Sequence, residues 1–253
     1  MSFVDLHCHL LPGLDDGAPS LTETIAHTRR LQADGVGDVV CTPHVKRLEF
    51  PGVAVREIAA RTAAAQRAVA HAGLRVRLHP GGELAHPDAL ELTADELALI
   101  AQGPAGARWV LLECPFAGLD EAFAAACARL TGLGYGLLLA HPERVRGIGA
   151  SGLEGLRALL AGGARAQVNV CSLLGRHGVA AEATGVALIR AGLACCVASD
   201  GHPGSREHTV RLGFELARRA GIGRSAARRL THGSPLGLLR LGMPRAAPAA
   251  HAA

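Results

Sequence analysis

The chain has 253 residues, 49% of them hydrophobic, which is enough for one sizeable core and is a usual length for a single α/β barrel. A net charge of only +4 and an aromatic content of 3% argue against a nucleic-acid surface. No basic leader and no apolar run of about 18 residues is present, so we expect neither export nor membrane insertion. The seven cysteines indicate reduced core thiols in a cytoplasmic protein.

Short β-rich runs alternate with helical patterns along the whole chain, as is typical of βα units and a mainly parallel sheet. After a first strand that ends on His7 and His9, strands are expected at 37–41, 75–79, 108–113, 136–140, 166–170 and 194–199. Helices are expected at 20–33, 55–72, 120–130, 153–160, 180–191, 206–220 and 224–230, with one or two short helices within 87–106. Residues 1–243 are predicted to form one domain and the Ala/Pro-rich residues 244–253 a disordered tail.

The first strand carries the first candidate metal ligands. His7 and His9 are two residues apart, so in a strand both point to one face, whereas Cys8 points to the other. A turn at Pro12 and Gly13 then brings in two carboxylates, Asp15 and Asp16. This arrangement can place imidazole and carboxylate groups on one cation.

Further polar residues follow the later strands. They are His44, Glu83, Glu113, His141, and the pair Asp200 and His202. In a closed parallel barrel these C-terminal strand ends meet at one mouth, whereas an open doubly wound sheet would scatter them along an edge. We therefore predict a seven-stranded (β/α) barrel with its active site at the C-terminal ends of the strands.

Five histidines and four carboxylates exceed what one tetrahedral zinc ion can use. Mixed imidazole and carboxylate ligands without thiolate suit Mn, Fe, Zn or Co, and their number indicates two or three ions. The candidate ligands are His7, His9, Asp16, His44, Glu83, Glu113, His141, Asp200 and His202, with Asp15 as a spare carboxylate.

Two arginines follow these ligands closely. Arg144 comes three residues after His141, and Arg206 comes four residues after His202. Because a guanidinium fork matches phosphate oxygens, the two arginines predict phosphate binding beside the metal site.

Cys41 and Arg47 offer a competing interpretation, because they satisfy the C-x5-R spacing of cysteine-dependent phosphatases. Such a loop needs converging backbone N–H groups, and this one contains Pro43 and no glycine. The metal-based interpretation is therefore preferred.

The motifs HCH, LDDG, TPH, GGEL, LLECP, AHPER, QVNVCSLLG and ASDGH occur in that order. Together they resemble the PHP (polymerase and histidinol phosphatase) superfamily, in particular its bacterial metal-dependent protein-tyrosine phosphatases of the CpsB, CapC and YwqE type. The resemblance implies a distorted (β/α)7 barrel, the nine ligands above around a trinuclear and often manganese centre, and Arg144 and Arg206 as catalytic, phosphate-binding residues.

The implied substrate is phosphotyrosine in the tail of a tyrosine kinase that controls capsule or exopolysaccharide synthesis. The implied mechanism is metal-assisted hydrolysis without a covalent phospho-enzyme. Two alternatives are a small-molecule phosphatase, such as one acting on histidinol phosphate, and a metal-holding scaffold without catalysis. Val45 and the loop 46–51 depart from many relatives, and the loop is expected to influence substrate choice. A homo-oligomer is compatible with the sequence.

Overall fold

The computed structural model describes residues 2–148 and 153–243. Within these ranges all strand pairs are parallel and form two sheets, ordered β1-β2-β4 and β3-β5-β6-β7-β8-β9. The strands are β1 (Phe3–Cys8), β2 (Val36–Cys41), β3 (His44–Val45), β4 (Arg77–Pro80), β5 (Glu83–Ala85), β6 (Trp109–Glu113), β7 (Gly136–Ala140), β8 (Arg165–Asn169) and β9 (Ala194–Ala198). The predicted disordered tail, 244–253, lies outside the described residues.

The two sheets form one distorted barrel with seven strand positions. β3 follows β2 after a break at Pro43, and β5 follows β4 after Gly81 and Gly82. These glycines are required for close approach, since a Cβ at Gly81 would lie 2.6 Å from the Val40 side chain. On the other side the ring closes between β9 and β1, where the N–H of His9 donates to the carbonyl of Gly201 at 2.8 Å.

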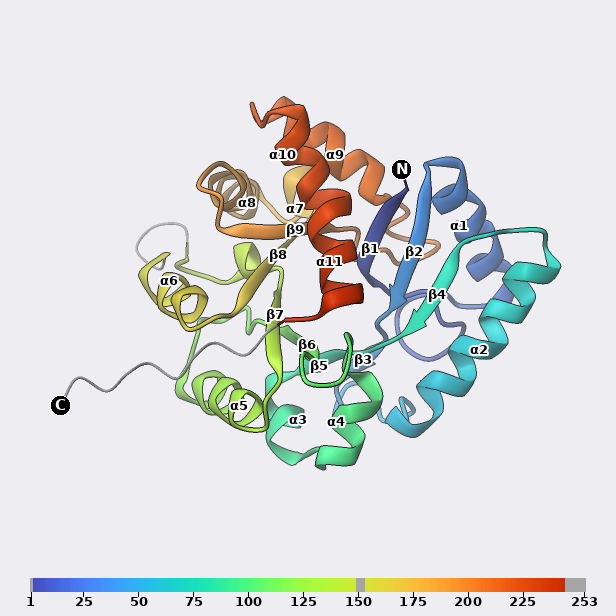
Figure 1. The fold of residues 1–253 in the computed structure, drawn as a ribbon, viewed down its shortest axis with the longest axis horizontal. Helices are drawn as coiled ribbons and strands as arrows, with labels where there is room; N and C mark the ends of the chain where they lie inside the picture. Colours follow the sequence, from blue (N-terminus) through green and yellow to red (C-terminus); the bar gives the residue numbers. More distant parts are fainter. Residues whose placement is uncertain (1, 149–152, 244–253) are drawn as a thin grey trace.

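Helices surround the ring of strands, and α11 lies across the centre of the view in Figure 1. The α-helices are α1 (Leu21–Ala33), α2 (Val55–His71), α3 (His86–Glu91), α4 (Ala94–Ile100), α5 (Glu121–Gly132), α6 (Leu153–Ala161), α7 (Val170–Leu173), α8 (Val179–Arg190), α9 (Val210–Arg219), α10 (Arg224–Arg228) and α11 (Ser234–Leu241). Two other turns are the 3-10 helix η1 (Pro142–Arg144) and the π-helical η2 (Arg229–Gly233). No helix in the described ranges has the length and apolarity to cross a membrane.

Three sequence-based expectations need correction. The helix expected at 206–220 begins only at Val210, because the preceding residues form a tight loop in which Arg206 N–H donates to the His202 carbonyl at 2.8 Å. The helix expected at 224–230 passes through η2 into α11, which was not predicted. The short strands β3 and β5, of two and three residues, were also missed, since such lengths carry no periodicity.

The N-terminal end of the barrel is closed by apolar packing. Trp109 at the start of β6 is fully buried, and its indole N–H donates to the Leu238 carbonyl of α11 at 2.9 Å. Met243, just after α11, belongs to the same buried cluster. Because this end is filled, the polar residues of the strands gather at the opposite, C-terminal end.

Candidate metal centre

All nine predicted ligands come together at the C-terminal ends of the strands. Their ligand atoms fall into four overlapping groups, and within each group the atoms lie within 4.8 Å of one another. The groups are His9, Asp16, His44 and His202; His7, Glu83 and His141; His7, His9 and Asp200; and His44, Glu83 and Glu113. The expectation that these residues meet at one mouth is therefore confirmed, while their role as metal ligands stays a prediction.

At the centre four buried atoms face one another: His7 Nε2, His9 Nε2, Glu83 Oε2 and Asp200 Oδ1. The two histidine nitrogens are 3.2 Å apart. Each of them lies 3.3 Å from the glutamate oxygen and 3.4 Å from the aspartate oxygen. Two atoms that bind one cation at about 2.1 Å lie about 3.0–3.4 Å apart, so the spacing matches a shared ion.

Hydrogen bonding alone does not account for this cluster. The carboxylate of Asp200 can only accept hydrogen bonds, so the group of Asn169 that lies 2.7 Å from it must be the amide nitrogen, which donates. This fixes the orientation of the Asn169 amide. Gln167 in turn donates to the Asn169 oxygen at 2.7 Å, which leaves the Gln167 oxygen to accept from His7 Nδ1 at 3.1 Å. The Nε2 lone pair of neutral His7 therefore faces the centre and is available to a cation.

Glu83 and His44 give a second indication. Glu83 Oε2 and His44 Nδ1 lie only 2.9 Å apart, yet both atoms are buried without a hydrogen-bond partner. Buried polar atoms of native proteins are rarely left unpaired, and a bound ion is a common reason for an exception. The residues present therefore fit a divalent cation.

The pKa values in the cluster are shifted strongly by the charges of its members. Burial lowers the pKa of His9, but the hydrogen bond to Asp15 and the nearby carboxylates of Asp200 and Glu83 outweigh this effect and raise the pKa well above its ordinary value. Burial likewise opposes ionisation of Glu83, but the nearby histidines hold its pKa well below the usual range. A bound cation would replace the protons on these imidazoles, so the affinity for metal should depend on pH.

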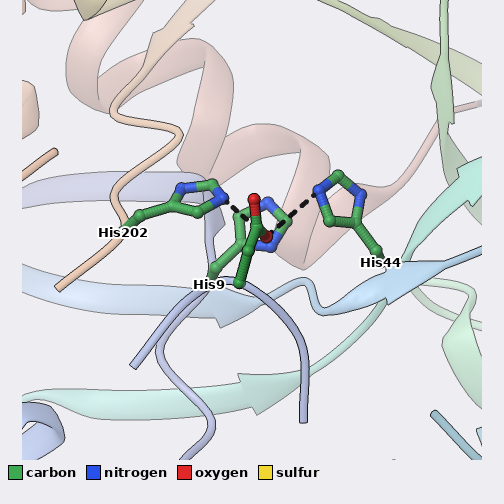
Figure 2. A group of neighbouring side chains, drawn as sticks. His9, His44 and His202 are labelled. Atoms are coloured by element: carbon green, nitrogen blue, oxygen red, sulfur yellow. Dashed lines mark hydrogen bonds and ion pairs between the residues drawn. The ribbon is translucent and has the colours of Figure 1, made fainter. Parts of the chain in front are cut away.

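The flanking groups extend the site on two sides. Glu83 Oε1 accepts from His141 Nε2 at 2.9 Å, so the two oxygens of one carboxylate face different histidines, as suits a bridging ligand. On the other side, Asp16 Oδ1 lies 3.4 Å from His44 Nε2 and 3.2 Å from His202 Nε2. Figure 2 shows His44 and His202 on opposite sides of His9.

Asp15 has a different role from the one expected. It is absent from the ligand groups of the described residues and instead accepts from His9 Nδ1 at 2.7 Å. It also accepts from the backbone N–H groups of Gly17 at 3.0 Å and His44 at 2.9 Å. Asp15 therefore orients the candidate ligand His9 and holds the backbone of a second one, His44.

The sequence analysis also missed Gln167 and Asn169, which lie two residues apart on β8. Alternation in a strand places both amides on one face, and two buried amides on one face are a detectable signal of a polar network. Both side chains are fully buried.

The two predicted arginines lie at the mouth of the site. Arg144 Nη1 is 3.7 Å from Asp200 Oδ2, and its guanidinium stands 4.3 Å from the centre of the Phe116 ring. Arg206 reaches the same carboxylate, with Nη2 at 3.5 Å from Asp200 Oδ1. Both guanidinium groups are partly exposed and can therefore meet an incoming anion.

A pocket of about 190 Å³ opens over the centre. It is lined by candidate ligands, by both arginines and by Lys46, Glu49, Phe50 and Phe116. Phe50 stacks on the His44 ring, with ring centres 4.9 Å apart, and Lys46 Nζ lies 2.7 Å from Glu113 Oε2. Phe50 and Lys46 belong to the loop 46–51 that was expected to influence substrate choice.

The competing C-x5-R interpretation fails in the structure. Cys41 is completely buried, and burial raises the pKa of its thiol far above the ordinary value, so it stays protonated and unreactive. The N–H of Arg47 donates to the carboxylate of Asp88, and the loop forms no phosphate cradle.

Known proteins resemble the chain in both sequence and fold. It is 31% identical over 201 residues to the tyrosine-protein phosphatase YwqE of Bacillus subtilis strain 168, covering 79% of this chain and 77% of that protein. Its fold is similar to that in "Crystal structures of YwqE from Bacillus subtilis and CpsB from Streptococcus pneumoniae, unique metal-dependent tyrosine phosphatases", with a TM-score of 0.77, 24% identity and 93% of each chain covered.

A more distant fold match is the phosphotriesterase homology protein of Escherichia coli, whose crystal structure holds phosphate in the active site. The TM-score is 0.59 at 13% identity, and the match covers 92% of this chain and 97% of that one. Residues 3–240 also match the family described as "Capsular polysaccharide synthesis, CpsB/CapC". With nearly its whole length matched, the chain belongs to the CpsB/CapC family of capsular polysaccharide synthesis proteins.

Proposed function

We propose that this chain is a metal-dependent phosphatase that hydrolyses phosphotyrosine in proteins. The observation that carries the proposal is the cluster of nine imidazole and carboxylate side chains with the pocket that opens over it, which two arginines and two phenylalanines also line. The relatives named as tyrosine phosphatases support the same activity.

The nine residues would hold two or three divalent ions. Nitrogen and oxygen ligands without sulfur suit manganese, iron, zinc or cobalt. Among these we propose manganese, which the resemblance to the PHP phosphatases implies. When bound, such ions supply Lewis acidity, which lowers the pKa of water and withdraws charge from phosphate oxygens. Asp15 and Gln167 would keep the Nε2 atoms of His9 and His7 directed at them.

Arg144 and Arg206 would bind the phosphoryl oxygens. Both already approach Asp200, from two sides, so a phosphate above that carboxylate would be met by two guanidinium groups. In the transition state the charge of the phosphoryl group is spread over its three equatorial oxygens, so cations fixed in that geometry stabilise this state more than the bound substrate. The Phe116 ring under Arg144 restricts the guanidinium to this position.

The phenylalanine side chains that line the pocket favour an aryl phosphate. Phe50 and Phe116 are two of only five phenylalanines in the chain, and both line the pocket. Their rings offer packing surfaces for a tyrosine ring. A phenolate also leaves more readily than an alkoxide, so the reaction asks less of a proton donor.

The proposed substrate is a phosphotyrosyl tail of a bacterial tyrosine kinase that controls capsule or exopolysaccharide synthesis, and the proposed compartment is the cytoplasm. The family's part in capsular polysaccharide synthesis supports this substrate. All seven cysteines are free, which is the usual state of thiols in a reducing compartment.

The test is a substrate panel run with added manganese. Phosphotyrosyl peptides, histidinol phosphate and sugar phosphates are compared by kcat/KM at equal metal loading. We expect the phosphotyrosyl peptides to be hydrolysed best. Preference for histidinol phosphate would reassign the chain as a small-molecule phosphatase, and no hydrolysis by a metal-loaded sample would leave only a scaffold role.

A further inference from the structure

We propose that a groove beside the metal pocket binds the polypeptide next to the phosphotyrosine, and that it selects apolar and basic side chains there. This inference rests on the proposed function and adds the surface that would read the substrate's sequence. We call this surface the flanking groove; its wall residues include Lys46, Leu48, Glu49, Pro87, Pro115 and Phe116.

The flanking groove is continuous with the metal pocket. It has a volume of about 340 Å³, and Lys46, Glu49, Glu113 and Phe116 line both cavities. A tyrosine ring that reaches the metal pocket would thus leave its own backbone at the edge of the flanking groove. The neighbouring residues of a polypeptide substrate would then meet this surface, which small phosphate esters do not reach.

The main apolar side chain of the groove is that of Leu48. This side chain is 96% exposed, although it lies only four residues after the candidate ligand His44. Phe116, 40% exposed and next to Pro115, lines both cavities. A large exposed apolar side chain beside a binding pocket is a common mark of a surface that becomes covered by a partner.

Most charged groups of the groove have a hydrogen-bond or ion-pair partner within the protein. Lys46 is paired with Glu113 at 2.7 Å, and the Asp88 carboxylate accepts from the backbone N–H of Arg47. Asp120 caps α5 by accepting from the Phe123 N–H at 2.8 Å.

Glu49 differs from these groups. Its side chain is 66% exposed, and it lies 3.7 Å from a lysine that Glu113 holds more closely. The groove therefore presents an accessible negative charge at Glu49, in addition to that of the exposed Asp120, beside an apolar surface. This combination complements a leucine-like and an arginine-like side chain.

The experiment compares two phosphotyrosyl hexapeptides with the manganese-loaded protein. One peptide carries leucine and arginine on both sides of the phosphotyrosine, and the other carries glycine at those positions. We expect the wild-type protein to favour the first peptide about tenfold in kcat/KM. Leu48→Ser should lower this ratio about fivefold, and Glu49→Gln should lower it by a smaller factor.

Leu241→Ser is the matched control, because Leu241 is also well exposed, at 74%, but lies on α11 at the other end of the barrel. It should leave the ratio unchanged. Equal hydrolysis of both peptides by the wild-type protein, or an unchanged ratio in Leu48→Ser, would overturn the flanking groove while leaving the phosphatase proposal intact. Hydrolysis of histidinol phosphate but of neither peptide would instead overturn the phosphatase proposal and the groove with it.

Discussion

The two ends of the barrel are built from opposite kinds of side chain on the same strands. β6 begins with Trp109, packed against α11, and ends with Glu113 in the candidate metal centre. The N-terminal end is apolar and filled, whereas the C-terminal end gathers buried imidazoles and carboxylates. The apolar packing that stabilises the fold is therefore concentrated at one end of the barrel, and the candidate catalytic residues lie at the other end.

This division has a cost at the C-terminal end. Glu83 and Asp200 are carboxylates in a buried cluster, and burial alone disfavours their charged forms. A bound cation offsets that cost and so stabilises the folded state by mass action. Substitutions of the candidate ligands should therefore change activity and metal content, and substitutions at the closed end should change stability.

Glu83→Gln gives the largest expected effect on this comparison. Glu83 approaches four histidines, His7, His9, His44 and His141, and the amide removes the charge they share. We expect kcat/KM on a phosphotyrosyl peptide to fall about 10³-fold, roughly 4 kcal/mol, together with metal content.

Cys41→Ala is the control for that variant, because Cys41 is buried in the hydrophobic core and belongs to none of the candidate ligand groups of the described residues. It should retain metal and most activity. Loss of activity in Cys41→Ala with folding and metal content intact would support the cysteine-based mechanism and contradict the metal-based one.

Substitutions of Arg144 and Arg206 have the next largest expected effect. Arg144→Ala and Arg206→Ala should each lower kcat/KM about 10²-fold, near 2.7 kcal/mol, with metal content unchanged. Lysine at either position should rescue only partly, since an ammonium keeps the charge and loses the fork. Steady-state kinetics with parallel metal analysis checks this, and near-wild-type kinetics in both alanine variants would remove these residues from the mechanism.

Trp109→Phe tests the closed end. The change removes the indole N–H that donates to the Leu238 carbonyl and leaves a small cavity in a fully buried site. We expect the free energy of unfolding to fall by about 2 kcal/mol, with kcat/KM and metal content within twofold of wild type at about 25 °C. Denaturant titration measures the loss; a large drop in activity at equal folded fraction would show that the two ends are coupled.

Asp38→Asn gives the smallest effect. Burial raises the pKa of Asp38, but His79 and the Arg77 fork outweigh it and lower the pKa from 3.8 to about 2. A depressed carboxyl pKa stabilises the fold above the unfolded value, and this contribution is lost as pH falls from about 4 to about 2.

The variant should therefore cost about 1 kcal/mol at neutral pH, and the deficit should shrink as pH falls through that window. Unfolding titrations at several pH values measure it. A deficit independent of pH would assign the loss to packing rather than to the ion pair.

The sequence predicted the seven main strands and the position of every candidate ligand because both depend on local pattern. His7 and His9 share a face by alternation, and each later ligand follows a strand whose direction the βα repeat determines. The convergence of Glu83 and His141, 58 residues apart, then follows from barrel closure.

Other features depend on contacts that no local pattern encodes. α11 contains Pro235 and Gly237, which weaken a helical pattern, and it is held in place by packing on Trp109. Asp15 and Asp16 are adjacent in sequence, and only the turn geometry decides that Asp16 joins the ligand group while Asp15 orients His9. Helix α9 starts later than expected for the same kind of reason, because His202 and Arg206 are bridged in a tight loop that precedes it.

The central claim is that the nine residues hold a multinuclear metal centre that hydrolyses phosphotyrosine. Its most direct test is a manganese titration of chelator-treated protein, with bound metal and hydrolysis of a phosphotyrosyl peptide measured on the same samples. We predict no hydrolysis without metal, activity that rises with occupancy, and saturation at two or three ions per chain. Full activity in metal-free protein, or saturation with metal and no hydrolysis of the peptide, would contradict it.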